Sequence, residues 1–242
     1  MERLFVQKNT KNTTMKKINI LLLFAIFPML IQAQEEGSDN SFKYLFDGKK
    51  VKVTGFGAPI HEFSAYDKEL AYCSGGGGAV LFDYSFFFGG YGMSLSNRFE
   101  KNFVRTLNDV FIYKYTYRLK MNHGGFWIGY IYKPQSVFHF SGSLKAGWGQ
   151  LAYYDSDYNI DKADEYYRDN IFVLTPQIEA EINFLRWLKV NAGVGYRYVG
   201  GIGTKDEEGN EVYKKNAFSS PIASISIMFG IFGKKQKNEN EK

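Results

Sequence analysis

Alternation between apolar and polar residues constrains this chain more than any other feature. From Leu188 to Val199 every second residue is apolar, and the residues between them are mostly Lys, Asn, Gly and Arg. A period of two predicts β-strands, because successive side chains of a strand point to opposite faces. Three other segments alternate as clearly: 137–153, 172–184 and 221–232. Three more read as strands with a less regular pattern: 51–63, 76–82 and 86–95.

Segment 113–132 also alternates, but its phase changes in the middle. Apolar residues occupy odd positions from Tyr113 to Met121 and even positions from Phe126 to Tyr132. A β-bulge around Gly124-Gly125 would shift the facing by one residue, and glycine suits a bulge. A tight hairpin at 123–125 is the alternative and would raise the strand count. The sequence leaves both interpretations open.

The connections between these segments indicate the topology. Three are short and lie near 83–85, 133–136 and 185–186; four are long and polar, at about 64–75, 96–112, 154–170 and 200–216. Long and short connections alternate, as they do in outer-membrane barrels with short periplasmic turns and longer external loops. We therefore predict an all-β fold, an antiparallel transmembrane β-barrel of about eight strands over 51–232.

The N-terminus carries the pattern of an export signal. Lys16 and Lys17 precede an uncharged stretch of fourteen residues, 18–31, and Ala33 offers a small residue at a cleavage position before Gln34. A membrane helix needs about 20 apolar residues, so this run is too short to be one. The predicted parts of the chain are a signal peptide over 1–33, with Met15 as an alternative start, a periplasmic segment over 34–50, the barrel over 51–232 and a charged tail over 233–242.

The charge and cysteine content exclude several function classes. Removing 1–33 removes five basic residues and one acidic residue, which leaves 25 basic and 24 acidic residues. The basic pI thus belongs largely to the signal, and no nucleic-acid partner is predicted. Cys73 is the single cysteine, so an intramolecular disulfide cannot form.

The strand pattern, the alternating connections and the last strand, which ends Met228-Phe229-Gly230-Ile231-Phe232, resemble the small outer-membrane β-barrel proteins of the OmpX and OmpA-barrel type. The resemblance covers about 51–232. It implies location in the outer membrane after export and contact with outer-membrane lipid. The tail from Gly233 to Lys242 departs from the usual pattern, in which the chain ends at the aromatic strand end. An architecture does not carry a function with it.

The direction of the apolar face decides between a membrane barrel and a soluble, lipocalin-like barrel. The polar face is rich in Gly, Ser, Thr and Asn with scattered charges, as expected of a narrow packed lumen. Aromatic residues gather near the strand ends, as the interface girdles of membrane barrels do. They include Tyr130, Tyr132, Phe138, Phe184, Trp187, Tyr196 and Tyr198. These features predict that the apolar face meets lipid.

The predicted lumen face carries charges that should pair, because an unpaired buried charge is costly. Glu181 and Lys189 flank a short turn on the same face and should be opposite or one diagonal step apart. We interpret the set as a structural network of ion pairs and hydrogen bonds. Its charged members are Lys145, Glu179, Glu181, Lys189 and Arg197, and its other polar members are His139 and Ser141.

No catalytic residue, metal site or cofactor is predicted. His139 with Ser141 would suit an outer-membrane lipid hydrolase, but no third member or oxyanion site is recognisable. His61-Glu62 reads as polarity at the rim. Asp155, Asp157 and Asp161 resemble half of a calcium loop, but Tyr166 stands where the completing bidentate carboxylate would be.

The loop with Asp155, Asp157, Asp161 and Tyr166 is the best candidate for contact with an external partner. The predicted function is a structural or surface-interaction role without catalysis. The alternatives are a lipid-modifying hydrolase, a narrow pore, or a soluble ligand-binding barrel. The sequence does not indicate an oligomeric state.

Overall fold

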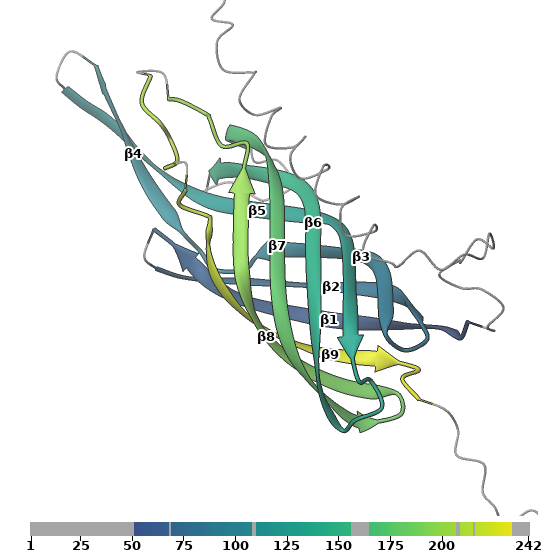
Figure 1. Cartoon of the computed structure of the whole chain (residues 1–242). Coiled ribbons are helices and arrows are strands. Elements are labelled where there is room, and N and C mark those ends of the chain that lie inside the picture. The colour runs from purple at the N-terminus through teal and green to yellow at the C-terminus, as the bar shows by residue number, and fades with distance from the viewer. Residues whose placement is uncertain are drawn as a thin grey trace, which may run out of the picture. The chain divides into compact units, whose positions relative to one another are not determined.

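A computed structural model describes residues 51–233 apart from 68, 108–109, 156–164, 207–208 and 215, with the backbone alone at 101–116, 155 and 165–166. The predicted signal peptide, segment 34–50 and the tail from 234 onward lie outside the described residues. None of the described residues forms a helix long and apolar enough to cross a membrane. The strands (Figure 1) are β1 (Val53–Tyr66), β2 (Glu69–Phe82), β3 (Phe86–Leu95), β4 (Glu100–Leu107), β5 (Val110–Tyr132), β6 (Phe138–Asp155), β7 (Glu165–Leu185), β8 (Leu188–Gly200) and β9 (Ser220–Gly230).

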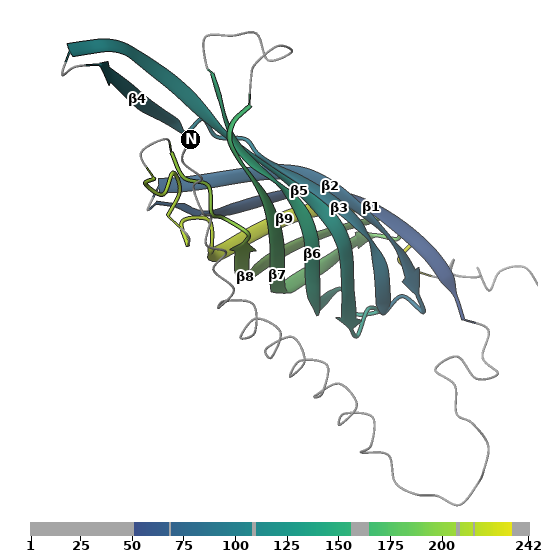
Figure 2. The same ribbon diagram turned by 90° about the horizontal axis from the view of Figure 1, so that it is seen from above.

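Eight of these strands close into an antiparallel barrel, which confirms the predicted fold class. The sheet runs β3-β2-β1-β9-β8-β7-β6-β5-β4, and an additional pairing of β3 with β5 closes the ring. The first and last strands of the barrel meet, since β1 pairs with β9. β4 pairs only with the outer part of β5, and this hairpin projects beyond the barrel (Figures 1 and 2).

The three short turns lie where the sequence predicts them, at 83–85, 133–137 and 186–187. At the opposite end, two predicted long loops are wrong. Segment 64–75 is strand, because β1 continues to Tyr66 and pairs there with Glu69 at the start of β2. Segment 96–112 contains the β4–β5 hairpin. Both segments are polar because these strands extend past the apolar band, so polarity alone made them resemble loops.

The phase change in β5 is neither a bulge nor a hairpin. β5 pairs with β6 in one unbroken register from Tyr117 opposite Asp155 to Tyr132 opposite Phe140. From Tyr117 onward the odd-numbered residues face the lumen, so Met121 and Trp127 are both buried. The apparent change of phase arises because the lumen is apolar along this strand. The outward face turns apolar only from Phe126 onward, and period two cannot separate two apolar faces.

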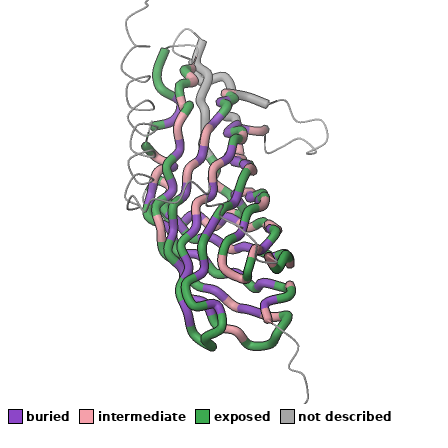
Figure 3. Tube along the Cα trace, turned by 45° about the vertical axis from the view of Figure 1, so that its right-hand side comes forward, coloured by how far each residue is buried: buried purple, intermediate pink, exposed green. Residues whose placement is uncertain are grey.

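The barrel buries one face of each strand and exposes the other, as the alternating colours in Figure 3 show. Along β8 the outward face is apolar and exposed, with Val194, Tyr196 and Tyr198 all near half exposed. The inward face of the same strand buries Lys189, Asn191 and Arg197. A soluble barrel would bury its apolar face and expose its charged face, so this arrangement is the reverse. It matches the prediction that the apolar face of each strand points outward.

The lumen has two different walls. Buried apolar side chains line the wall of β1, β2, β3 and β5, and they include Phe56, Ile60, Leu81, Phe87 and Trp127. Most buried polar side chains lie on β6 to β9. The irregular alternation of 51–95 follows from the first wall, because strands that are apolar inside and outside show a weak period of two.

Gly77 shows why the glycine run 75–78 sits inside β2. A Cβ at this position would lie 3.0 Å from the Trp127 ring and 2.9 Å from the Gly90 carbonyl oxygen. The missing side chain therefore lets the Trp127 side chain of β5 pack directly against the backbone of β2, with β3 lying between these two strands in the sheet.

Candidate functional site: the polar lumen

Among the described residues, the lumen holds three buried basic residues, Lys145, Lys189 and Arg197, and three buried glutamates, Glu62, Glu179 and Glu181. Buried charges need partners at hydrogen-bond distance. The contacts fall into three groups, which follow one another along the barrel from the end with the short turns to the opposite end.

The first group joins His139, Glu181 and Lys189. Glu181 Oε2 accepts hydrogen bonds from His139 Nε2 at 2.9 Å and from Lys189 Nζ at 3.0 Å. Glu181 lies opposite Asn191, and Lys189 lies opposite Asn183, so the pair spans one diagonal of the β7–β8 ladder. The spacing around the short turn predicted this contact.

The second group gathers around Glu179. Ser141 and Ser143 donate hydrogen bonds to its two carboxylate oxygens, at 2.9 and 3.4 Å. Gln177 donates its amide N–H to the same carboxylate and accepts from Lys145 Nζ at 3.3 Å. The amide of Gln177 thus links Lys145 to Glu179, and sequence reasoning had not selected it.

Lys145 also marks the boundary between the two walls of the lumen. Its ammonium lies 5.7 Å from the centre of the Trp127 ring. A cation over an aromatic face is attracted by the ring quadrupole, more strongly where water is excluded. The polar wall is therefore joined to the apolar wall by a cation–π contact.

The third group crosses the barrel from β8 to β1. Arg197 donates to Glu62 Oε1 at 3.0 Å, to Ser64 Oγ at 2.7 Å and to the Phe218 carbonyl oxygen at 3.2 Å. Its Nη1 is 3.5 Å from Cys73 Sγ. The guanidinium is 1% exposed, so its charge is balanced inside the lumen.

Glu62 is a correction to the sequence-based interpretation, which placed it at the rim. Its side chain is buried and paired with Arg197, whereas His61 faces outward and bonds Tyr72 Oη at 2.7 Å. Glu62 shares the even-numbered face of β1 with Phe56 and Ile60, which are also buried, so its position in the strand pattern did indicate burial. Period two alone, however, could not assign this face to the lumen, because its neighbouring members are apolar.

Aromatic side chains cover both ends of the polar lumen. Beside the short turns, the Phe232 ring lies 6.0 Å from the Phe56 ring, and Lys189 Nζ lies 4.7 Å from the centre of the Phe232 ring. At the other end, Phe218 stacks 4.5 Å from Tyr66. Tyr213 stacks 5.2 Å from Tyr153 in the same region.

Segment 201–219 is held over this outer end by specific contacts. Asp169 accepts hydrogen bonds from the backbone N–H groups of Gly203 and Thr204, and from the Thr204 hydroxyl at 2.7 Å. Burial raises the pKa of the Tyr213 phenol, which keeps it protonated, and it donates to the Tyr167 carbonyl oxygen at 2.9 Å. These contacts fix the segment as a cover.

The candidate Ser–His pair does not form. His139 contacts Ser136 O, Glu181 and Lys189, while Ser141 donates to Glu179. A nucleophile needs its base within hydrogen-bond reach. Within the described part of the chain, no group of three His, Cys, Asp or Glu side chains could hold a metal ion. The arrangement of these residues supports packing and charge balance.

The predicted external loop lies largely beyond what the structure describes. Asp157 and Asp161 fall outside the described residues, and the side chains of Asp155 and Tyr166 do as well. The backbone places Asp155 at the end of β6 and Tyr166 near the start of β7. The role of this loop in external contact stays a prediction.

Comparison with known proteins finds no matching family model and no matching curated protein. The chain is similar to the crystal structure of Neisserial surface protein A, with 8% identity over 76% of this chain and 100% of that chain and a TM-score of 0.49. It is similar to the N-terminal β-barrel domain of Pseudomonas aeruginosa OprF, with 10% identity over 74% and 97% and a TM-score of 0.38. For Yersinia pestis Ail, the attachment invasion locus protein, the identity is 9% over 74% and 98%, with a TM-score of 0.41. The fold assignment itself follows from this chain's own strand pairing.

Proposed function

We propose that this chain is a non-catalytic outer-membrane barrel that displays its outer loops and the β4–β5 hairpin at the cell surface. The observation that carries the proposal is the reversed burial, with charged side chains inside the barrel and aromatic and aliphatic side chains outside. Exposing a surface like this to water costs free energy, and transferring it into hydrocarbon is favourable. The export signal predicted at the N-terminus supports the same location.

Two exposed aromatic groups fit the two interfaces of a bilayer. Tyr130, Tyr132 and Phe138 are more than half exposed near one short turn, and Phe184 and Trp187 are near another. Trp148 and Tyr198 are 60% and 51% exposed further toward the opposite end. Aromatic side chains favour the headgroup level, so each of these two groups fits one interface. Bacterial barrels have short periplasmic turns and longer external loops, so we assign the short turns to the periplasm and the hairpin to the outside.

Fractionation and gel migration test this proposal directly. We expect the protein in the detergent-resistant outer-membrane pellet, and we expect its gel mobility to change on boiling because a closed barrel resists unfolding by cold detergent. Recovery from the soluble periplasmic fraction, without a change of mobility, would contradict the proposal. It would instead indicate a soluble barrel.

The packed lumen predicts that the protein is not an open pore. Side chains of the three polar groups fill the barrel, and Phe218 and Phe232 cover its two ends. Planar-bilayer recordings of the purified, folded protein should therefore show no stable conductance step. The control is a known open barrel in the same membrane. A steady single-channel conductance would show that the cover or the network opens.

A further inference from the structure

The outer wall of the barrel carries a continuous row of aromatic rings from β3 to β7. Phe88 stacks 5.8 Å from Phe126, which lies 6.5 Å from Trp148, and Trp148 lies 5.7 Å from Phe172. Phe88, Phe126 and Trp148 are 47%, 54% and 60% exposed. We call these four residues the aromatic row. Its rings face the surroundings of the barrel and form an apolar surface.

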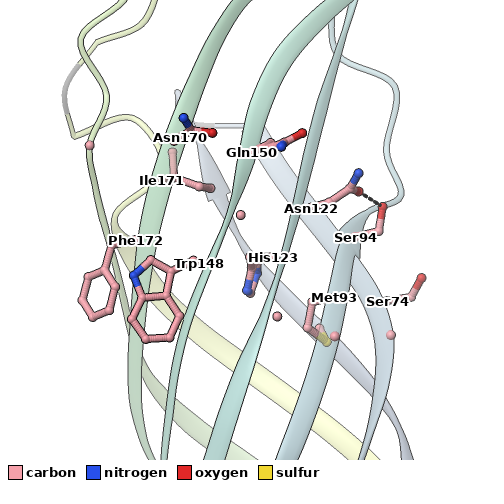
Figure 4. Close-up of a pocket in the computed structure, with 15 residues that line it drawn as sticks. Ser74, Met93, Ser94, Asn122, His123, Trp148, Gln150, Asn170, Ile171 and Phe172 are labelled. Carbon is pink, nitrogen blue, oxygen red and sulfur yellow. Dashed lines mark hydrogen bonds between the residues drawn. The ribbon is translucent and has the colours of Figure 1, made fainter.

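A row of amide side chains lies next to the aromatic row, one step farther from the short turns. Asn122 pairs in register with Gln150, and Gln150 pairs with Asn170, so the three amides sit side by side on β5, β6 and β7. Ser94 on β3 donates to Asn122 Oδ1 at 2.7 Å (Figure 4). The three amides line a shallow groove together with Trp148 and Phe172 of the aromatic row.

Two basic residues stand beyond the amides. Lys120 on β5 lies opposite Ala152 on β6. On the other side of Ala152 the β6–β7 register shifts between the pairs Leu151–Asp169 and Tyr153–Tyr166, and Arg168 lies at this shift. They flank Ala152 from its two sides, two strand spacings or about 10 Å apart. Lys120 Nζ also lies 5.1 Å from the Tyr154 ring centre, and Arg168 is exposed.

We infer that this wall binds a phosphorylated lipid of the outer leaflet, and this inference rests on the proposed membrane location. The order along the strands, from aromatic row to amides to cations, matches the order within such a lipid. Acyl chains would cover the aromatic row, amide or ester linkages would meet the amides, and phosphate would reach Lys120 and Arg168. Cations and phosphate oxygens form strong, charge-assisted hydrogen bonds.

Lipid titration followed by native mass spectrometry tests the inference. The folded protein is titrated with lipid A, and separately with lipid A whose phosphates have been removed. We expect the phosphorylated form to bind more tightly to the natural chain. The double variant Lys120→Gln/Arg168→Gln should weaken that binding by at least about tenfold, because two charge-assisted contacts are lost. Binding of the dephosphorylated lipid should change little.

The matched control removes two lysines at the other end of the barrel. Lys52 and Lys133 are exposed and lie 5.3 and 5.2 Å from the Tyr84 and Tyr132 ring centres, so Lys52→Gln/Lys133→Gln removes the same formal charge and also removes lysine–tyrosine contacts of the kind that Lys120 makes. This variant should bind lipid A like the natural chain. Equal binding by both double variants, or no preference for phosphate, would overturn the inference. A chain that shows no boiling-dependent gel shift in vesicles would instead overturn the proposed membrane barrel.

Discussion

Replacing Arg197 by methionine is expected to lower the free energy of unfolding by about 3–5 kcal/mol, since this is the usual cost of removing one partner of a buried ion pair. The guanidinium is the ion-pair partner of Glu62 in the lumen and also donates to Ser64 and Phe218. Without it, the Glu62 carboxylate would be buried with no cation at hydrogen-bond distance. Urea titration of the folded protein in phosphatidylcholine vesicles, followed by the fraction of fast-migrating folded band, measures the change.

Two further variants make this result specific to the ion pair. Arg186→Met removes an exposed arginine at a short turn and should change stability by less than about 0.5 kcal/mol. Glu62→Leu/Arg197→Met removes both charges and should be more stable than Arg197→Met, because no uncompensated charge is left. If Arg197→Met unfolds at the same urea concentration as the natural chain, the lumen pair does not stabilise the barrel.

Replacing Trp127 by alanine should cost about 3–5 kcal/mol, the range found for truncating large buried aromatic residues. Trp127 is 1% exposed and packs edge-on against Phe56 and Phe87 at 5.6 and 5.3 Å. Its loss would leave a cavity between the two walls and remove the ring beneath Lys145. The same urea titration reports the change.

Trp187→Ala is the control for the aromatic truncation. Trp187 is 53% exposed in the short turn after β7 and stacks on Phe229, at 6.2 Å. We expect a clearly smaller loss, because no lumen cavity forms. Equal losses for the two tryptophans would show that the apolar wall of the lumen is no better packed than the outer surface.

The sequence predicted the second half of the barrel well, because there the two faces differ in polarity. On β7 and β8 the inward residues Glu179, Glu181, Lys189 and Arg197 alternate with outward apolar ones, so period two located both the strands and the facing. The diagonal contact between Glu181 and Lys189 followed from the length of the turn. The first half was less predictable, because Phe56 and Trp127 point inward from strands that are also apolar outside.

What the sequence missed depends on contacts between distant residues. Glu62 lies 135 residues from Arg197, and nothing local to it indicates a buried ion pair. The outer hairpin was read as a loop because polarity reports contact with water and not backbone conformation. Asn122, Gln150 and Asn170 become neighbours only through the register of three strands.

The separation of Arg197 from Glu62 has a consequence for the order of assembly. The hydrogen bonds of the other two buried glutamates form among the consecutive strands β6, β7 and β8: Glu181 and Lys189 are 8 residues apart on one hairpin, and Ser141 meets Glu179 across β6 and β7. The carboxylate that balances Arg197 is supplied by β1, which reaches the C-terminal strands only when β1 pairs with β9. An open, partly inserted sheet would therefore carry Arg197 without its Glu62 partner. The pairing of β1 with β9, which closes the barrel, would neutralise this buried cation, so the ion pair favours closure.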